Sequence, residues 1–159
     1  MLADSFVKKI QEELGETWIP HIYESRILKL RTRPYHFENL KPLARVTIQH
    51  TLLGVELKVG RRRLLCPDLA TARYLAVFAG TGCPDVAIPY DITRISVLAD
   101  ELESSWYRML LLAEQEVGQQ NLKQLTRLRG LLFAKIRSEI AAAGSGTAIP
   151  EFRDLRKRR

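Results

Sequence analysis

The 159-residue chain has few cysteines, few histidines and no long apolar run. Its two cysteines, Cys66 and Cys83, are too few for the disulfide scaffold of a small secreted domain. The apolar runs fall short of the roughly 18 residues that a membrane span requires, and the N-terminal residues lack the basic start and apolar core of a secretion signal. We therefore expect a cytoplasmic protein that does not enter a membrane.

Motifs for metals, cofactors and nucleophilic catalysis are also scarce. The two cysteines lie 17 residues apart, without a cysteine or histidine at the spacing of a zinc site. The segment Gly80-Thr81-Gly82 follows an expected helix, whereas a phosphate-binding glycine loop follows a strand. The three histidines, which are His21, His36 and His50, are isolated from one another in the sequence. We therefore expect no metal site, no cofactor and no catalytic residue.

The charge of the chain is sorted into blocks along its length. The net charge is +7, but residues 25–63 carry +8 and residues 117–159 carry +7. Residues 1–24 carry −3 and residues 85–116 carry −5. Two basic blocks that flank an acidic segment point to a polyanion or an acidic protein surface as the partner.

Hydrophobic periodicity predicts an α/β fold. A helix is expected over residues 3–15, and a second, almost entirely apolar helix follows Pro67 and runs to about Ala79. A helix over residues 20–30 is the alternative to the first expected strand. The elements should form a small mixed sheet in helix-strand-strand-strand-helix-strand order, within an α/β core of residues 1–91. Alternating apolar residues predict the strands at 26–33, 44–52, 55–59, 62–66 and 85–89.

The remainder of the chain is predicted to be helical. Apolar stripes at helical spacing run over about residues 92–117 and 120–143, and Gly118 interrupts them. Two such helices joined by a short break should fold back as an antiparallel hairpin over residues 92–143, packed on the core or extending from it. Residues 144–159 are expected to form a flexible linker and a basic tail.

Two expectations concern the side chains of this hairpin. Three acidic residues of its first helix should pair with basic side chains of the last helix, and these are Asp100, Glu101 and Glu103. Trp106 falls on the apolar stripe, so we interpret it as a core or helix-pairing residue rather than as a platform on which a nucleic-acid base stacks.

The densest charge in the expected core is Arg61-Arg62-Arg63, at the tip of a predicted β-hairpin. Arginine forks pair with phosphate oxygens in a bidentate manner, so this tip is a candidate contact for a phosphate backbone. Alternatively, the charges only keep an exposed hairpin from pairing with other strands. Strand alternation also turns neighbouring basic residues outward, and the expected nucleic-acid-binding residues are Arg31, Arg33, Lys58, Arg61, Arg62, Arg63, Arg156, Lys157, Arg158 and Arg159.

The tripeptide Glu56-Leu57-Lys58 lies on one of the alternating strands. Together with the order of elements over residues 3–90, it resembles the core of the PD-(D/E)xK nuclease superfamily, which carries an acid-x-Lys motif on its third strand. The resemblance implies that Glu56 and Lys58 hold Mg²⁺ and position an attacking water. The family places a second metal-binding acid on the preceding strand, but residues 44–52 contain neither Asp nor Glu.

The sequence thus leads to one expected function and two alternatives. We expect a non-enzymatic basic protein whose cationic face engages nucleic acid, a nucleoprotein or another acidic assembly. The first alternative is a divergent metal-dependent nuclease that uses Glu56 and Lys58. The second is a protein-docking or oligomerisation module that acts through the helical hairpin of residues 92–143.

Overall fold

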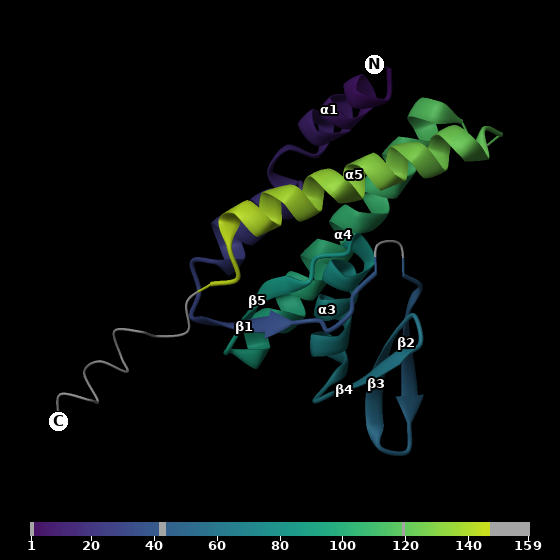
Figure 1. The fold of residues 1–159 in the computed structure, drawn as a ribbon. Helices are drawn as coiled ribbons and strands as arrows, with labels where there is room; N and C mark the ends of the chain where they lie inside the picture. The colour runs from purple at the N-terminus through teal and green to yellow at the C-terminus, as the bar shows by residue number, and fades with distance from the viewer. Residues whose placement is uncertain (1, 42–43, 119, 147–159) are drawn as a thin grey trace.

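The computed structural model of the chain describes residues 2–41, 44–118 and 120–146. The basic tail, Arg156 to Arg159, lies outside these described residues. The expected α/β class and the C-terminal helical hairpin are confirmed (Figure 1). The elements follow in the order α1 (Leu2–Leu14), η1 (Gly15–Thr17), α2 (Ile19–Ile22), η2 (Tyr23–Ile27), β1 (Thr32–His36), β2 (Val46–Thr51), β3 (Gly54–Val59), β4 (Arg62–Cys66), α3 (Leu69–Thr81), β5 (Asp85–Pro89), α4 (Ile92–Val117) and α5 (Leu122–Ala143).

The strands form two separate antiparallel sheets, so the expectation of one mixed sheet is wrong. Strands β2, β3 and β4 pair in sequence order as a meander, and β1 pairs with the distant β5. Figure 1 shows the two sheets at different places beside α3. The reason is that tight hairpins join β2 to β3 and β3 to β4, whereas β5 follows α3 and returns to β1.

The segment 26–33 is not one strand: helical turns run from Ile19 to Ile27, a turn follows, and β1 takes up only the last two residues, which corrects the prediction of a strand and agrees in part with the helical alternative over 20–30. The π-helical turn η2 buries Tyr23 and Ile27 completely, and the strand begins only at Thr32. Strand β1 then passes through Pro34 rather than stopping there. Pro34 lies opposite Ala87, and the N–H of Ala87 points away from β1, to the hydroxyl of Tyr23. The two residues are therefore a pair without hydrogen bonds between them, and proline, which has no N–H, removes no bond from the sheet.

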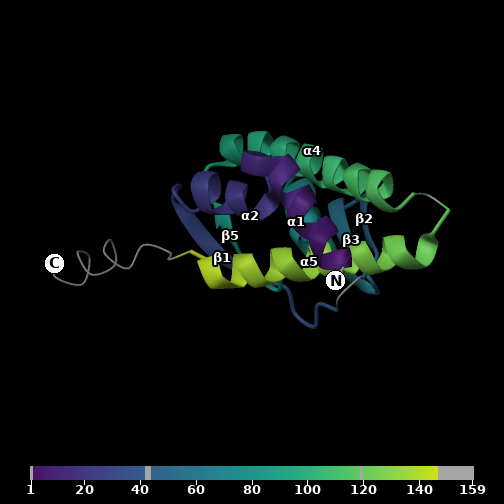
Figure 2. The same cartoon turned by 90° about the horizontal axis from the view of Figure 1, so that it is seen from above.

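The first helices of the chain pack across the two long helices. Figure 1 shows α1 above α5 at the outside of the molecule, and Figure 2, seen from above, shows α1 and α2 over the space between α4 and α5; α1 packs against both. The predicted stripes are buried within this arrangement, among them Leu102 on α4 and Leu132 on α5, both 0% exposed. The exception is Leu122, which is 71% exposed at the start of α5. Every helix in the described part of the chain is too short or too polar to span a membrane.

Asp100, Glu101 and Glu103 of α4 pair with residues outside the last helix, which corrects a third expectation. The guanidinium of Arg73, on α3, bonds to Asp100 at 2.5 Å and to Glu103 at 2.6 Å. Glu101 forms an ion pair with Arg26 of η2. Helix α3 packs closely against α4, so the single charged side chain of α3 meets these acids first.

Candidate functional site

The meander of β2, β3 and β4 has one buried face and one open face. Its buried face includes Leu57, which is 0% exposed and lies on the side that packs against α3. The register places Lys58 directly opposite Thr47 on β2 and directly opposite Arg63 on β4. Because neighbouring residues of a strand point to opposite faces, Thr47, Lys58 and Arg63 share the open face.

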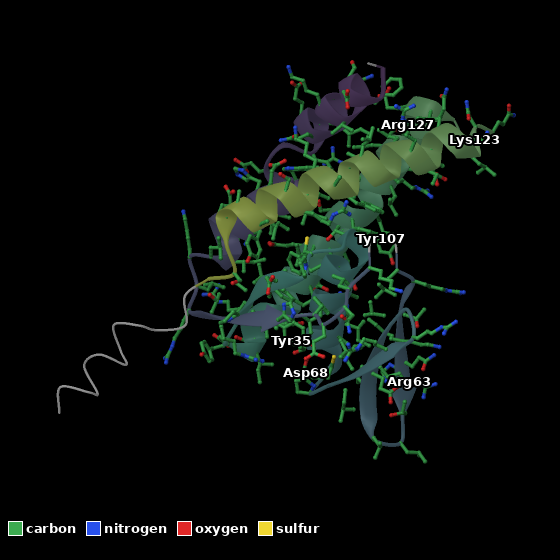
Figure 3. All side chains as sticks on the ribbon, viewed as in Figure 1. Tyr35, Arg63, Asp68, Tyr107, Lys123 and Arg127 are labelled. Carbon is green, nitrogen blue, oxygen red and sulfur yellow. The ribbon has the colours of Figure 1, made fainter. Side chains whose placement is uncertain are left out.

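Four basic side chains gather at one end of the meander, where three lie on the open face and Arg61 lies in the turn between β3 and β4. Gly60 N–H bonds to Arg45 O at 2.8 Å, so Arg45 continues β2 beside the turn that joins β3 to β4. Figure 3 shows Arg63 on the side of the meander away from α3. Among the ion pairs of the described residues, none includes a member of this group. We call the group the basic cluster, and its members are Arg45, Lys58, Arg61 and Arg63.

The three adjacent arginines expected at the hairpin tip do not act as one unit. Arg62 lies opposite Val59 and therefore turns toward the buried face. Its guanidinium donates to the backbone oxygen of Glu38 at 3.3 Å and pairs with the Glu38 carboxylate at 3.2 Å. Arg62 thus connects the meander to the loop after β1, while Arg61 and Arg63 stay with the basic cluster.

Arg31 and Arg33 lie apart from the basic cluster. Arg33 belongs to β1 and lies opposite Ile88, so it is part of the other sheet. Arg31 precedes β1, and its guanidinium carbon lies 5.2 Å from the centre of the Tyr90 ring. The structure therefore does not join these two arginines to Lys58 and Arg63 on one face, because β1 does not pair with the meander.

Glu56 lies on the third strand, as the nuclease resemblance requires. It shares the open face with Gln49 and Leu65, which lie opposite it on β2 and β4. Its Oε1 is buried and has no hydrogen-bond partner in the described part of the chain. Within that same part, no group of three or more His, Cys, Asp or Glu side chains is arranged to hold a metal ion.

A groove of about 420 Å³ lies beside the meander, and the sequence did not reveal it. We call it the side groove, and it is lined by Val46 and Ile48 of β2 and by aromatic residues of the helices. Trp106 of α4 stacks on Phe133 of α5 with ring centroids 5.0 Å apart. Gly80 makes room for the indole, since a Cβ there would come within 3.3 Å of Trp106 Cη2.

Tyr107 also lines the side groove, and it is 68% exposed. Figure 3 places it on α4, near the part of the chain that leads into the meander. Trp106 is partly buried against the core, as predicted, but it also faces the groove. Tyr107, an aromatic residue next to the apolar stripe of α4, was the feature of the sequence that could have indicated this groove.

A search of known protein families, curated proteins and solved structures finds no match to this chain. Two features of the chain itself point to a function: the basic cluster on the meander, and the side groove that borders the same sheet.

Proposed function

We propose that this protein binds the phosphate backbone of nucleic acid through the basic cluster. The main support is that Lys58 and Arg63 lie directly opposite each other, with Arg45 and Arg61 at the same end of the sheet. Like charges in such a pair repel and destabilise the sheet. A bound phosphate would offset this repulsion, and arginine forks match its oxygens in geometry.

The open face is suited to binding that is independent of nucleotide sequence. Thr47 and Gln49 lie beside the basic side chains, and hydroxyl and amide groups of this kind commonly bond to phosphate and sugar. The positive net charge of +7 would also attract a polyanion from a distance. Contacts of this type position a nucleic acid without distinguishing its bases.

The salt dependence of binding tests this proposal. We expect the affinity for duplex DNA to fall with a log–log slope of about −0.9 for each phosphate contact. Replacing both Lys58 and Arg63 by Ala should reduce the steepness of this slope by about two units. Replacing Arg31 and Arg33 by Ala is the matched control, because it removes the same charge from the other sheet. Equal slopes in the two double variants would contradict the assignment of the basic cluster.

The nuclease alternative has one supporting observation, the unpartnered Oε1 of Glu56. The variant Glu56→Gln separates the two functions. If the cluster only binds phosphate, removing this negative charge should tighten binding, and neither wild type nor variant should cleave DNA with Mg²⁺ or Mn²⁺. Cleavage by the wild type that disappears in Glu56→Gln would overturn the binding proposal in favour of catalysis.

The docking alternative draws less support from the helical hairpin. Its apolar stripes, which include Leu102 and Leu132, are buried within the chain rather than left open for a partner. Only Tyr107 and Leu111 are neighbours, one turn apart on α4, among the large apolar side chains that remain exposed on the described part of the hairpin, which are Ile92, Val97, Tyr107, Leu111 and Leu122.

A further inference from the structure

We infer that the preferred ligand is single-stranded nucleic acid, and that one of its bases enters the side groove and stacks on Tyr107. This inference rests on the proposed function, since it assumes that the basic cluster holds the phosphates. It adds a second contact, which the cluster alone would not provide, and it identifies the class of nucleic acid.

The side groove and the basic cluster lie on opposite faces of the meander and meet at the free edge of β2, because Val46 and Ile48 of the buried face line the groove. Thr47 lines the groove and lies directly opposite Lys58, which in turn lies opposite Arg63. Ala44 and Val46, the two neighbours of Arg45 in the sequence, line the groove as well. A backbone held by Arg45 and Lys58 would therefore run beside the free edge of β2, and a base would turn around this edge to enter the groove.

The chemistry of the groove suits a base rather than a phosphate. Its lining is aromatic and aliphatic, and Tyr107 exposes 68% of its surface. The one cation in the lining is Arg73, which Asp100 and Glu103 neutralise at 2.5 Å and 2.6 Å. Phosphates should therefore stay on the strand side, where the basic cluster is not neutralised by carboxylates of the described residues.

Only an unpaired base can make this contact. In a duplex, both faces of each base are covered by its neighbours in the stack, so entry into the groove requires unstacking. A single strand offers its bases without this cost, and aromatic side chains beside a basic surface are typical of proteins that bind single strands. The combination of groove and cluster thus favours single strands over duplexes.

The test compares single-stranded and duplex ligands in the same titration. The probes are oligothymidine, oligouridine and a thymidine–adenine duplex of equal length, followed by fluorescence anisotropy. We expect Tyr107→Ala to weaken single-strand binding about tenfold and to leave duplex binding unchanged, whereas Tyr107→Phe keeps the affinity. The control is Tyr90→Ala, since Tyr90 is an exposed aromatic residue at 44% but lies beside the other sheet.

Tryptophan fluorescence reports the same event without a substitution. Trp106 lines the groove, so a stacked base should quench its emission. Trp18 is 3% exposed and donates its indole N–H to Glu139, so its emission should not respond. Quenching by oligothymidine or oligouridine, without quenching by the duplex, would support the inference.

The two proposals fail in different ways. If neither single strands nor duplexes bind, the basic cluster does not hold phosphate and the proposed function is wrong. If both bind equally, and Tyr107→Ala changes neither affinity, the proposed function stands and the single-strand inference is overturned. Circular dichroism of each variant confirms that the exposed substitution has left the fold intact.

Discussion

The two sheets of this protein differ in how far their faces and edges are buried. In the β1–β5 sheet, four consecutive residues of β5, from Val86 to Pro89, are buried. In the meander, only one face is buried, and the other presents the basic cluster to solvent. The first sheet is part of the core, whereas the second is a surface supported by α3 from behind.

The edge of β5 that faces away from β1 has its hydrogen-bonding groups satisfied by side chains. Ala87 donates its N–H to the Tyr23 hydroxyl at 2.9 Å, and Tyr74 donates its hydroxyl to Ala87 O at 2.6 Å. Tyr23 in turn donates to Gly144 O at 2.5 Å. Two tyrosines thus take the place of a missing strand, whereas the edge of β2 borders the side groove.

Truncation of the buried sheet should give the largest change in stability. Ile88 is 1% exposed in β5, so Ile88→Ala should lower the free energy of unfolding by about 2–5 kcal/mol. Ile48 in β2 is only half-buried, and Ile48→Ala should cost roughly half as much because less apolar surface is lost. Urea denaturation measures both values. Similar losses would mean that the meander is as essential to the core as β5.

Removal of one tyrosine hydroxyl should have a smaller effect. Tyr74→Phe leaves the buried oxygen of Ala87 without its donor, which should cost about 1–3 kcal/mol in unfolding free energy. Tyr107→Phe is the control, because Tyr107 is exposed and its hydroxyl should contribute less than about 0.5 kcal/mol. If the two variants unfold at the same urea concentration, the hydroxyl does not close the edge of β5.

Alkaline pH should weaken the buried sheet through the same tyrosines. Burial raises the pKa of Tyr23 to about 12 and the pKa of Tyr74 well above its usual value. The unfolded chain releases these protons near pH 10 while the folded chain keeps them, so the contribution of the two tyrosines to stability is full below about pH 10 and falls as the pH rises from there.

The expected decrease is about 1.4 kcal/mol per pH unit for each tyrosine in this range. Urea titrations between about pH 8 and pH 11 measure it, and Tyr74→Phe should show a shallower decrease than the wild type. A free energy of unfolding that stays constant up to about pH 11 would argue against buried, protonated tyrosines.

The smallest effect should have the opposite sign. Lys58→Thr removes one member of the like-charged pair with Arg63, and it should raise the free energy of unfolding by about 0.2–1 kcal/mol. The same variant should bind duplex DNA more weakly, with a salt slope about one unit less steep. A variant that is less stable than the wild type would show that Lys58 is a structural residue of the sheet.

The elements that the sequence predicted well depend on nearby residues. Asp68 accepts a hydrogen bond from Thr71 N–H at 2.7 Å and begins α3 where it was expected. Gly60 has a φ of 60° and closes the turn between β3 and β4, as the pattern of that segment indicated. The apolar stripes of α4 and α5 also appeared in the sequence, because helical spacing alone brings their members onto one face.

The candidate site could be predicted only in part. Arg61, Arg63 and Lys58 were expected on an outward surface, and they lie there. The side groove was missed because its walls come from β2, α3, α4 and α5, which are distant in the sequence.

The sequence by itself determined the helices, the hairpins of the meander and the excess of positive charge, since each follows from neighbouring residues. The tertiary structure alone decided which charges meet. Burial of Leu57 against α3 selects the inner face of the meander, and the register then turns Arg62 toward Glu38 and Arg63 toward Lys58. Adjacent arginines thus receive different surroundings, because the direction of a side chain depends on which face of its strand is buried.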